Sequence, residues 1–272
     1  MAGARAEVRA GIDAAWLVSA LARDPVDHAF PAWDLANEPD RTRFVSLVSS
    51  EDPTRTLAYF AVWRGDPIRP VVHWFGDLPR AAPLLPHLPL RPLDLLGPPA
   101  LAGPLRARRG PVEVEGIERM VYAGPSTVRG ADDPRVRPAG AADGERLRSW
   151  ARRHGDDPMV RGYAFFDPAR HAVWIADDGR GEVVGASFAA VRLPPIWTLT
   201  AIWVAPEHRG TGLGRALTAA PAAAARRAGA LAHLNVRSDN AVARRLYDSL
   251  GFRRHDRQVL VRTVGGGTGH NA

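Results

Sequence analysis

The sequence predicts an α/β protein built from two halves, of which the second is the more regular. Apolar stretches of strand length and helix length alternate through residues 135–263. A similar but less complete pattern occupies residues 1–124, and the segment 125–134 between the two is rich in turn formers and poor in apolar residues. These observations predict two α/β domains joined by a linker at 125–134, with a flexible tail at 264–272.

A weak internal repeat supports the two-half organisation. Segments 52–76 and 167–190 both begin Asp-Pro-x-Arg, and each continues as an apolar strand, a glycine-containing turn and a second apolar strand with Val-Val. Helix-compatible stretches lie upstream of them, at 13–23 and 140–153. The same α–β–β unit is therefore expected twice.

The rest of the first half is irregular. Prolines in segment 78–111 argue against long helices and central strands. A strand-like stretch, 116–124, follows and leads into the linker.

The second half continues as alternating strands and helices. Residues 135–150 read as a short strand entering a helix, and 196–206 as a buried strand that ends at Pro206. A helix is expected at 214–230, closed by Gly229. The remaining predictions are a strand at 231–237, a helix at 240–250 that ends at Gly251, and a strand region at 252–262.

Composition is that of a soluble globular protein, with 46% hydrophobic and 24% charged residues. No apolar run reaches about 18 residues, so no membrane partner is expected, and residues 14–22 read as an amphipathic helix, not a signal peptide. The chain has no cysteine, which excludes disulfides, thiolate metal sites and a covalent cysteine intermediate. A cytoplasmic location fits this composition.

The net charge is +7, and every basic residue counted as Lys or Arg is an arginine. Two interpretations are open: arginine-rich codon usage of a GC-rich genome, or an anionic partner such as nucleic acid. The arginines are scattered among acidic neighbours, so we expect no nucleic acid partner. Arginine also suits a phosphorylated cofactor.

The stretch "PEHRGTGLGRAL" (206–217) carries the clearest functional pattern. Gly210, Gly212 and Gly214 lie between a predicted strand and a helix, where unpaired N–H groups and the helix dipole favour a diphosphate. Arg209 and Arg215 can add charge-assisted bonds. A plain turn is the alternative. A Walker loop is excluded because the chain has no lysine, and the pattern G-x-G-x-x-G fails at Arg215.

Here the sequence resembles a known family. "VAPEHRGTGLGRAL" resembles the acetyl-CoA loop of the GCN5-related N-acetyltransferases (GNAT), Arg/Gln-x-x-Gly-x-Gly/Ala, with Arg209, Gly212 and Gly214 in the motif positions. Residues 240–252 resemble the second signature of that family, matched at Asn240, Ala243, Leu246, Tyr247, Gly251 and Phe252. Residues 136–143 look like its opening strand and helix start, so the resemblance covers about 135–263.

The resemblance implies a GNAT fold in the C-terminal half, which is a mixed, mostly antiparallel sheet flanked by helices. The N-terminal half would be a degenerate GNAT-like copy with no cofactor. It also implies acetyl-CoA, or another acyl-CoA, as co-substrate and no metal. Pantetheine would lie between 199–205 and 231–236. The implied cofactor-binding residues are Ile202, Trp203, Val204, Arg209, Gly210, Thr211, Gly212, Leu213, Gly214, Arg215 and Asn240.

Tyr247 is the expected catalytic residue. Asn240 and Tyr247 are seven residues apart and share a helix face, about 10 Å from each other along the axis. The resemblance places Tyr247 near the cofactor sulfur, where its phenol can protonate the departing thiolate. The alternatives are a packed core tyrosine and, for Asn240, a helix cap.

Three features depart from the family pattern or leave it incomplete. Segment 198–204 has no glutamate, so no general base is assigned, although a water relay remains open. Pro221 should kink or end the helix after the loop. The aromatic segment 161–174 lies on the expected acceptor side, where Tyr163, Phe165, Phe166 and Trp174 are candidates to line a pocket or pack in the core. His154, Asp167, His171, Glu207 and His208 are expected at the surface.

The function predicted is acyl-CoA-dependent N-acyl transfer, with acetyl as the default donor group. A primary amine of a small molecule or peptide would attack directly in a ternary complex, because no cysteine can carry the acyl group. The alternative is a non-catalytic acyl-CoA-binding regulatory module. The sequence does not fix the oligomeric state, and a monomer with pseudo-dimeric halves is compatible with it.

Overall fold

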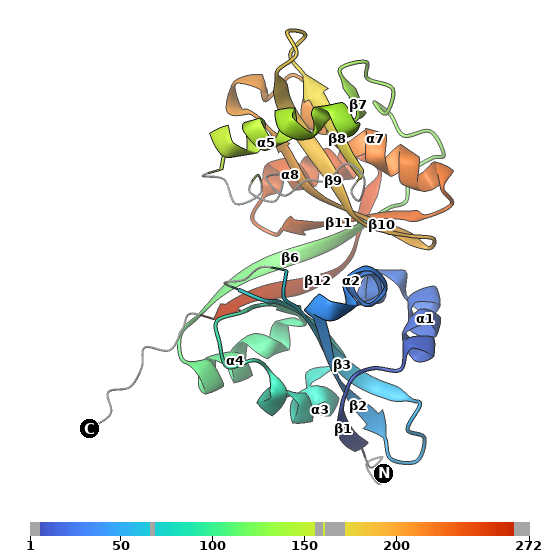
Figure 1. The fold of residues 1–272 in the computed structure, drawn as a ribbon, viewed down its shortest axis with the longest axis vertical. Coiled ribbons are helices and arrows are strands. Elements are labelled where there is room, and N and C mark those ends of the chain that lie inside the picture. Colours follow the sequence, from blue (N-terminus) through green and yellow to red (C-terminus); the bar gives the residue numbers. More distant parts are fainter. Residues whose placement is uncertain (1–5, 66–68, 156–159, 161–171, 264–272) are drawn as a thin grey trace, which may run out of the picture. The chain divides into compact units, whose positions relative to one another are not determined.

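The computed structural model describes residues 6–65, 69–155, 160 and 172–263. Their contacts divide the chain into two compact α/β units (Figure 1). The N-terminal unit contains the chain up to Glu118, residues 237–239 and the chain from Asp256 onward. The C-terminal unit contains residues 119–236 and 240–255.

The N-terminal unit is a mixed sheet with helices on its faces. Strands β1, β2, β3 and β4 pair antiparallel in that order, and β4 pairs in parallel with β5 on its other side. The elements are β1 (Ala6–Ala10), α1 (Ala14–Arg23), α2 (Pro25–Asn37), β2 (Thr42–Ser49), β3 (Thr56–Trp63), β4 (Val71–Phe75), α3 (Leu78–Ala81), β5 (Asp94–Gly97) and α4 (Ala102–Arg109).

The C-terminal unit repeats this topology strand for strand. Strands β7, β8, β9 and β10 pair antiparallel in that order, and β10 pairs in parallel with β11 on its other side. The elements are β7 (Val136–Pro138), α5 (Gly144–Arg153), β8 (Ala172–Asp177), β9 (Val183–Leu193), β10 (Ile196–Val204), α7 (Leu213–Arg227), β11 (Leu231–Arg237) and α8 (Ala241–Leu250). The expected mixed, mostly antiparallel sheet flanked by helices is therefore confirmed.

The repeat itself is real, but the sequence echo aligns it one strand out of step. The echo matches the hairpin β3–β4 (52–76) with β8–β9 (167–190). In the topology, β4 and β10 are equivalent because each is antiparallel to one neighbour and parallel to the other. The error arises because any two adjacent hairpins share an apolar strand, a glycine turn and an apolar strand.

Two long strands, β6 (Val112–Tyr122) and β12 (Phe252–Thr263), contribute residues to both units. The division at Glu118 and Arg119 precedes the linker predicted at 125–134, which lies within the C-terminal unit. The second part of β12 belongs to the N-terminal unit, where it pairs antiparallel with β5 from Val259 to Arg262. Local sequence patterns predict that a strand forms, but not which sheet it joins.

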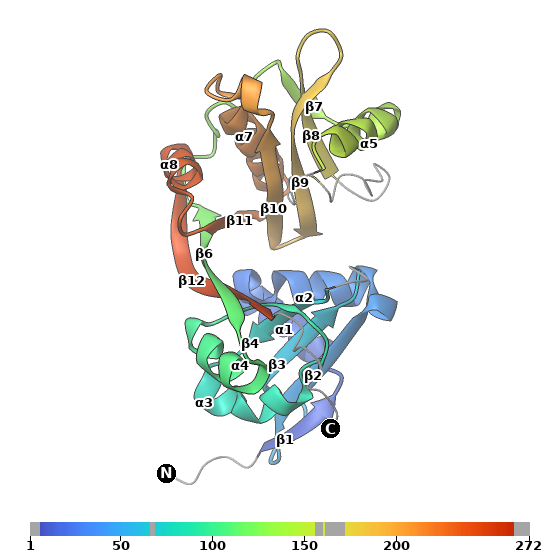
Figure 2. The same cartoon turned by 90° about the vertical axis from the view of Figure 1, so that its left-hand side faces the viewer.

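Each unit has its own core. In the N-terminal unit, apolar side chains of β2 to β5 pack against α3 and α4. In the C-terminal unit, α7 and α8 cover one face of the sheet and α5 covers the other. Figure 2 shows β8, β9 and β10 between α7 and α5.

Helix ends follow their capping residues. Asp13 accepts a hydrogen bond from the Trp16 N–H at 2.7 Å at the start of α1. Asp24 does the same for Asp27 at 3.1 Å, with Pro25 as the first residue of α2. Gly251 ends α8 with a φ of +105°, a left-handed conformation that favours glycine.

One proline-based expectation is corrected, and another is decided only in part. Pro221 lies inside α7, which continues without interruption from Leu213 to Arg227. The helix therefore does not end at Pro221, whose side chain lies on the buried face of α7, and a kink there stays a prediction. Segment 78–111 has only short helices as expected, but it also supplies β5, which lies between β4 and β12. The four residues of β5 contain no proline.

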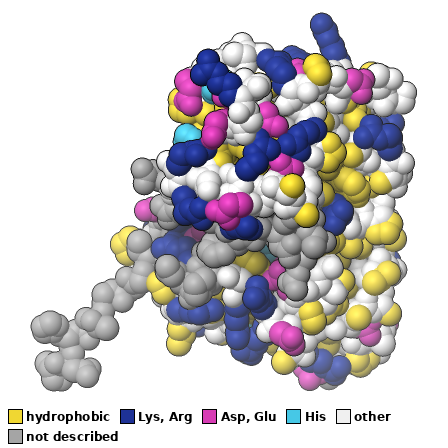
Figure 3. Space-filling view, turned by 45° about the horizontal axis from the view of Figure 1, so that its top comes forward, with side chains coloured by type: hydrophobic (Ala, Val, Ile, Leu, Met, Phe, Trp, Pro, Cys, Tyr) yellow, Lys and Arg dark blue, Asp and Glu magenta, His cyan; other side chains and the backbone are white. Residues whose placement is uncertain are grey.

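No helix in the described part of the chain combines the length and apolar character needed to cross a membrane. On the face drawn in Figure 3, basic side chains lie scattered among acidic and apolar ones, with no continuous basic surface.

Candidate active site

The site is built where β10 parts from β11. The two strands pair from Ile196 with Leu231 to Leu199 with Leu234, and β10 then continues to Val204 without a further register pair to β11 among the described residues. The unpaired stretch predicted between 199–205 and 231–236 is thus shorter than expected, because residues 231–234 still pair with β10.

A bulge in β10 accompanies this parting. The register with β9 passes from Thr200 opposite Phe188 directly to Trp203 opposite Ala186, so Ala201 and Ile202 are skipped. Ala201 has a φ of 50°, which costs a non-glycine residue about 1–2 kcal/mol. A bulge bends a strand and turns its main-chain groups away from the regular ladder. The predicted contact residues Ile202, Trp203 and Val204 therefore lie at and just beyond an irregular segment.

The glycine loop joins this strand to α7. A short 3₁₀ turn, Pro206–His208, follows β10, and Gly212 caps α7. Gly210 and Gly212 have φ angles of +78° and +87°, so the chain path requires glycine at both. Gly214 differs, because its φ is ordinary and an added Cβ would lie 3.5 Å from Leu246, an ordinary contact distance.

The first turn of α7 presents unpaired donors. Within the described residues, no hydrogen bond uses the N–H of Leu213, Gly214 or Arg215, and the first helical bond is from Ala216 to the Gly212 carbonyl at 3.1 Å. These N–H groups and the positive end of the helix dipole form an anion site. Phosphate oxygens approaching them would meet no side chain at Gly212 or Gly214.

The two predicted arginines make different contacts. Arg209 donates from Nε to the Val204 carbonyl at 3.0 Å, and its guanidinium lies 5.7 Å from the Trp203 ring centre. It therefore ties the loop back to the end of β10. Arg215 donates to the Ser249 hydroxyl at 2.8 Å and joins the first turn of α7 to α8. Thr211 Oγ1 donates to the His208 carbonyl at 2.7 Å and closes the turn within the loop.

Tyr247 lies on the face of α8 that packs against the rest of the unit. The side chain is buried and packs in the core cluster with Phe252. Its hydroxyl makes no hydrogen bond within the described residues. Burial raises the pKa of Tyr247 to about 12, so the phenol keeps its proton at every physiological pH. Tyr247 is thus a core tyrosine, and its role as the catalytic residue stays a prediction.

Asn240 is a helix cap. Its Oδ1 accepts a hydrogen bond from the Ala243 N–H at 3.0 Å at the start of α8, and the residue is exposed. Such a cap contributes about 1 kcal/mol to stability. Nδ2 remains the atom through which Asn240 could donate to a ligand.

The acceptor side is largely outside the described residues, since Tyr163, Phe165, Phe166, Asp167 and His171 all fall there. Trp174 is buried in the core with α7 and does not line an open surface. His154, expected at the surface, is half-buried with its ring 5.0 Å from the Trp203 ring. Glu207 is exposed as expected, whereas His208 is half-buried.

The sequence interpretation missed two polar features of this site. Thr198 and His233 are register partners on β10 and β11 just before the strands part, fully buried, with Oγ1 and Nδ1 3.2 Å apart. Arg135 donates to the Thr211 carbonyl at 3.2 Å, from the first residue after the predicted linker. The signal that could have identified Thr198 and His233 is a polar residue in the middle of an otherwise apolar strand. Nothing in the local sequence marks Arg135.

Comparison with known proteins agrees with this geometry. Residues 141–252 match the family model described as "Acetyltransferase (GNAT) family". A mycothiol acetyltransferase of Kocuria rhizophila is 34% identical over 115 residues, which is 40% of this chain and 38% of that protein. A mycothiol acetyltransferase of Rhodococcus opacus is 34% identical over 157 residues, or 54% and 49% of the two chains. The chain thus matches less than half the length of these relatives.

The fold also resembles solved structures. A tandem GNAT protein from the clavulanic acid biosynthesis pathway aligns with 97% of this chain and 100% of its own, with a TM-score of 0.58 and 16% identity. A GCN5-related N-acetyltransferase-like protein from Streptococcus suis aligns with 92% and 99%, with a TM-score of 0.60 and 13% identity. At these identities the likeness concerns the fold, and it extends over both units.

Proposed function

The chain belongs to the GNAT acetyltransferase family through residues 141–252, and on this premise we propose that it transfers an acetyl group from acetyl-CoA to a primary amine. The observation that carries the proposal is the combination of two features on β10. The strand leaves β11 after Leu199, and it leads into a glycine loop that presents the unpaired N–H groups of α7.

In this proposal the loop holds the cofactor diphosphate. The N–H groups of Leu213, Gly214 and Arg215 face the anion, and the left-handed Gly210 and Gly212 allow the main chain to approach it. The pantetheine arm occupies the space that an additional strand pair would fill beside residues 200–204. Main-chain groups there bond its amides, and an N–H near Val204 polarises the thioester carbonyl.

The chemical step is a direct attack. The amine nitrogen forms a bond to the thioester carbonyl carbon, and the carbon–sulfur bond then breaks. The departing thiolate takes the proton of the Tyr247 hydroxyl, and the attacking nitrogen loses its own proton to solvent. Because burial raises the pKa of Tyr247 to about 12, the phenol carries its proton at neutral pH, and the phenolate left after donation is reprotonated from solvent. The described residues of β10 offer no carboxylate as base.

We propose a small-molecule amine as acceptor. The two relatives are named mycothiol acetyltransferases, which supports a small acceptor for this chain. A non-catalytic acyl-CoA-binding module is the second candidate, and the lack of an acidic residue on β10 favours it. We take acetyl as the acyl group that is transferred.

Release of free thiol from acetyl-CoA, followed with a panel of small amines and short peptides, tests the proposal. We expect amine-dependent release by the wild-type chain and none by Gly212→Asp, whose carboxylate repels the diphosphate. Binding of acetyl-CoA with no release for any amine would favour the binding module.

A further inference from the structure

Arg135 braces the glycine loop from outside the family motifs. Its NH1 donates to the Thr211 carbonyl at 3.2 Å, and an added Cβ on Gly212 would lie 3.7 Å from its NH2. The guanidinium therefore lies directly against the left-handed part of the loop. Thr211 is the residue between Gly210 and Gly212, so this contact acts where the two glycines allow the main chain the widest choice of conformation.

Asp133 fixes the direction of this guanidinium. It accepts from the Arg135 Nε at 2.9 Å and NH2 at 2.7 Å, and also from the Arg135 main-chain N–H at 3.0 Å. These bonds lower the pKa of the Asp133 carboxyl, so it stays ionised near neutral pH. With Nε and NH2 held by the carboxylate, NH1 remains for the Thr211 carbonyl. The pair is thus a rigid fork pointing at the loop.

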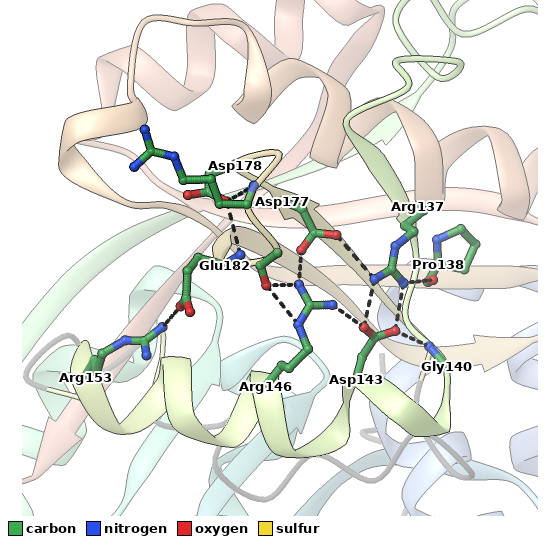
Figure 4. Close-up of polar contacts among 11 residues, drawn as sticks. Arg137, Pro138, Gly140, Asp143, Arg146, Arg153, Asp177, Asp178 and Glu182 are labelled. Carbon is green, nitrogen blue, oxygen red and sulfur yellow. Dashed lines mark hydrogen bonds and ion pairs between the residues drawn. The ribbon is translucent and has the colours of Figure 1, made fainter.

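The base of the fork is fixed to the sheet. The Arg135 carbonyl accepts from the Asp177 N–H at 3.4 Å, and β7 begins at the next residue. Two residues further on, Arg137 bonds Asp143 at 2.7 and 2.8 Å and Asp177 at 3.3 Å. Arg146 bonds the same two carboxylates, as Figure 4 shows. These hydrogen bonds hold β7, β8 and the start of α5 in fixed positions relative to one another.

The segment before the fork is also anchored. Val128 is 3% exposed and packs in the core cluster with α7 and α8. An added Cβ on Gly130 would lie 3.5 Å from the Arg215 side chain, at the first turn of α7. Residues 128–135 therefore run past the N-terminus of α7 with contacts at both ends. This segment is a packed part of the C-terminal unit and not a linker between units.

We propose that Arg135, oriented by Asp133, is a positioning residue that holds the glycine loop in the conformation that binds the cofactor diphosphate. This rests on the proposed function. Nε, NH1 and NH2 each donate to a protein oxygen, so the contact that Arg135 makes at this site is with the loop itself. Gly210 and Gly212 make the loop conformationally permissive, and the brace removes that freedom before the ligand arrives.

The contribution of this pair to overall stability is small. The Arg135 side chain is 44% exposed, and exposed ion pairs contribute about 0–1 kcal/mol. An Arg135→Ala chain therefore folds, and its defect is confined to the loop. The matched control is Arg148→Ala, because Arg148 is 39% exposed and makes a comparable pair with Glu145 on α5.

The test compares three acetyl donors in the thiol-release assay: acetyl-CoA, acetyl-3′-dephospho-CoA and S-acetylpantetheine. The first two carry the diphosphate and the third does not. For Arg135→Ala we expect KM to rise about tenfold with both diphosphate donors, the scale of one lost charged hydrogen bond. Its kcat changes by less than about twofold, because uniform binding is what is lost. S-acetylpantetheine should react as with wild type, and Arg148→Ala should match wild type throughout.

Three results would overturn the inference while leaving the proposed function intact. One is an unchanged KM for acetyl-CoA in Arg135→Ala. Another is an equal loss with S-acetylpantetheine, which would mean general damage to the unit. The third is a loss with acetyl-CoA alone, which would make Arg135 a ligand of the 3′-phosphate. A wild-type chain that neither binds nor cleaves acetyl-CoA overturns the proposed function, and this inference with it.

Discussion

At the scale of single residues, Tyr247 combines a structural and a chemical property. It lies in the core of the C-terminal unit, yet its hydroxyl has no partner within the described residues. The hydroxyl oxygen is not among the fully buried polar atoms that lack a partner, so it is not closed off from an approaching ligand. A ligand thiolate is the partner that the proposed reaction supplies. Helix capping was one of the two roles that the sequence offered for Asn240, and the structure confirms it, whereas the face shared with Tyr247 stays a prediction.

Tyr247→Phe should therefore lower kcat about 10²-fold, the scale of losing one proton donor. The dissociation constant of acetyl-CoA should not change, since the ring remains in place. Steady-state kinetics beside calorimetry checks both values. A kcat equal to that of wild type would remove Tyr247 from the mechanism.

The pH profile gives an independent check on the same residue. An acid catalyst must be protonated, and burial raises the pKa of Tyr247 to about 12, so its proton stays bound up to pH 10. We expect kcat to show no alkaline fall below pH 10 that is due to Tyr247. A fall near pH 8 that vanishes in Tyr247→Phe would contradict the assignment.

At the scale of elements, the glycine loop shows what sequence can and cannot supply. Its position between strand and helix follows from the apolar pattern and the glycine spacing. The bulge in β10 does not, because Ala201 adopts a φ of 50° without being glycine and no local signal marks it. The brace by Arg135 is also invisible locally, because it is 76 residues from Thr211 in sequence.

Gly212→Ala and Gly179→Ala form a matched pair. Both glycines have left-handed φ angles, +87° and +83°, so each substitution costs about 1–2 kcal/mol of stability. Only Gly212 lies in the loop, whereas Gly179 is in the turn between β8 and β9. Calorimetry should show weakened acetyl-CoA binding for Gly212→Ala alone. Equal affinity in the two variants would separate the loop from cofactor binding.

Asp143 makes the anchoring network sensitive to acid. Hydrogen bonds from Arg137, with the charge of Arg146, hold the pKa of the Asp143 carboxyl well below its usual range. A depressed pKa stabilises the fold above the unfolded value near pH 4, and that stabilisation is lost as pH falls below it. Asp143→Asn should thus lose about 2 kcal/mol at pH 7.

Urea unfolding at pH 7 and at pH 2.5 measures this effect. The difference in free energy of unfolding between wild type and Asp143→Asn should shrink at the lower pH. Glu145→Gln is the control, because Glu145 forms exposed pairs and should change stability by less than about 0.5 kcal/mol. A difference that does not depend on pH would exclude the ionised carboxylate as its source.

At the scale of the whole chain, the sequence predicted two α/β halves of the same kind but not their composition. The C-terminal unit includes residues 119–134, with Met120, Tyr122 and Val128 in its core. It does not include residues 256–263, of which Val259 and Val261 pack in the N-terminal core. Strand assignment to a sheet depends on long-range pairing, which no local pattern encodes.

This division predicts how fragments behave. A fragment of residues 119–255 keeps the whole C-terminal core and should bind acetyl-CoA. A fragment of residues 135–263, cut at the apparent linker, loses three buried core side chains and Asp133, and should bind none. Circular dichroism and calorimetry compare the two. Equal binding by the shorter core would contradict the assignment of residues 119–134.

In the described part of the N-terminal unit, the segment corresponding to the glycine loop is built differently. An added Cβ on Gly97 of β5 would lie 3.0 Å from the Trp74 Cβ on β4 and 2.6 Å from Leu101, so this stretch is tightly packed. The segment after β4 forms the four-residue helix α3 and has no glycine-rich loop. We therefore expect one cofactor for each chain.

Calorimetric titration of the folded wild-type chain with acetyl-CoA tests the central claim most directly. A single binding event with one acetyl-CoA for each chain, absent in Gly212→Asp, is the result predicted. No heat of binding with wild type, or equal binding by Gly212→Asp, would contradict it.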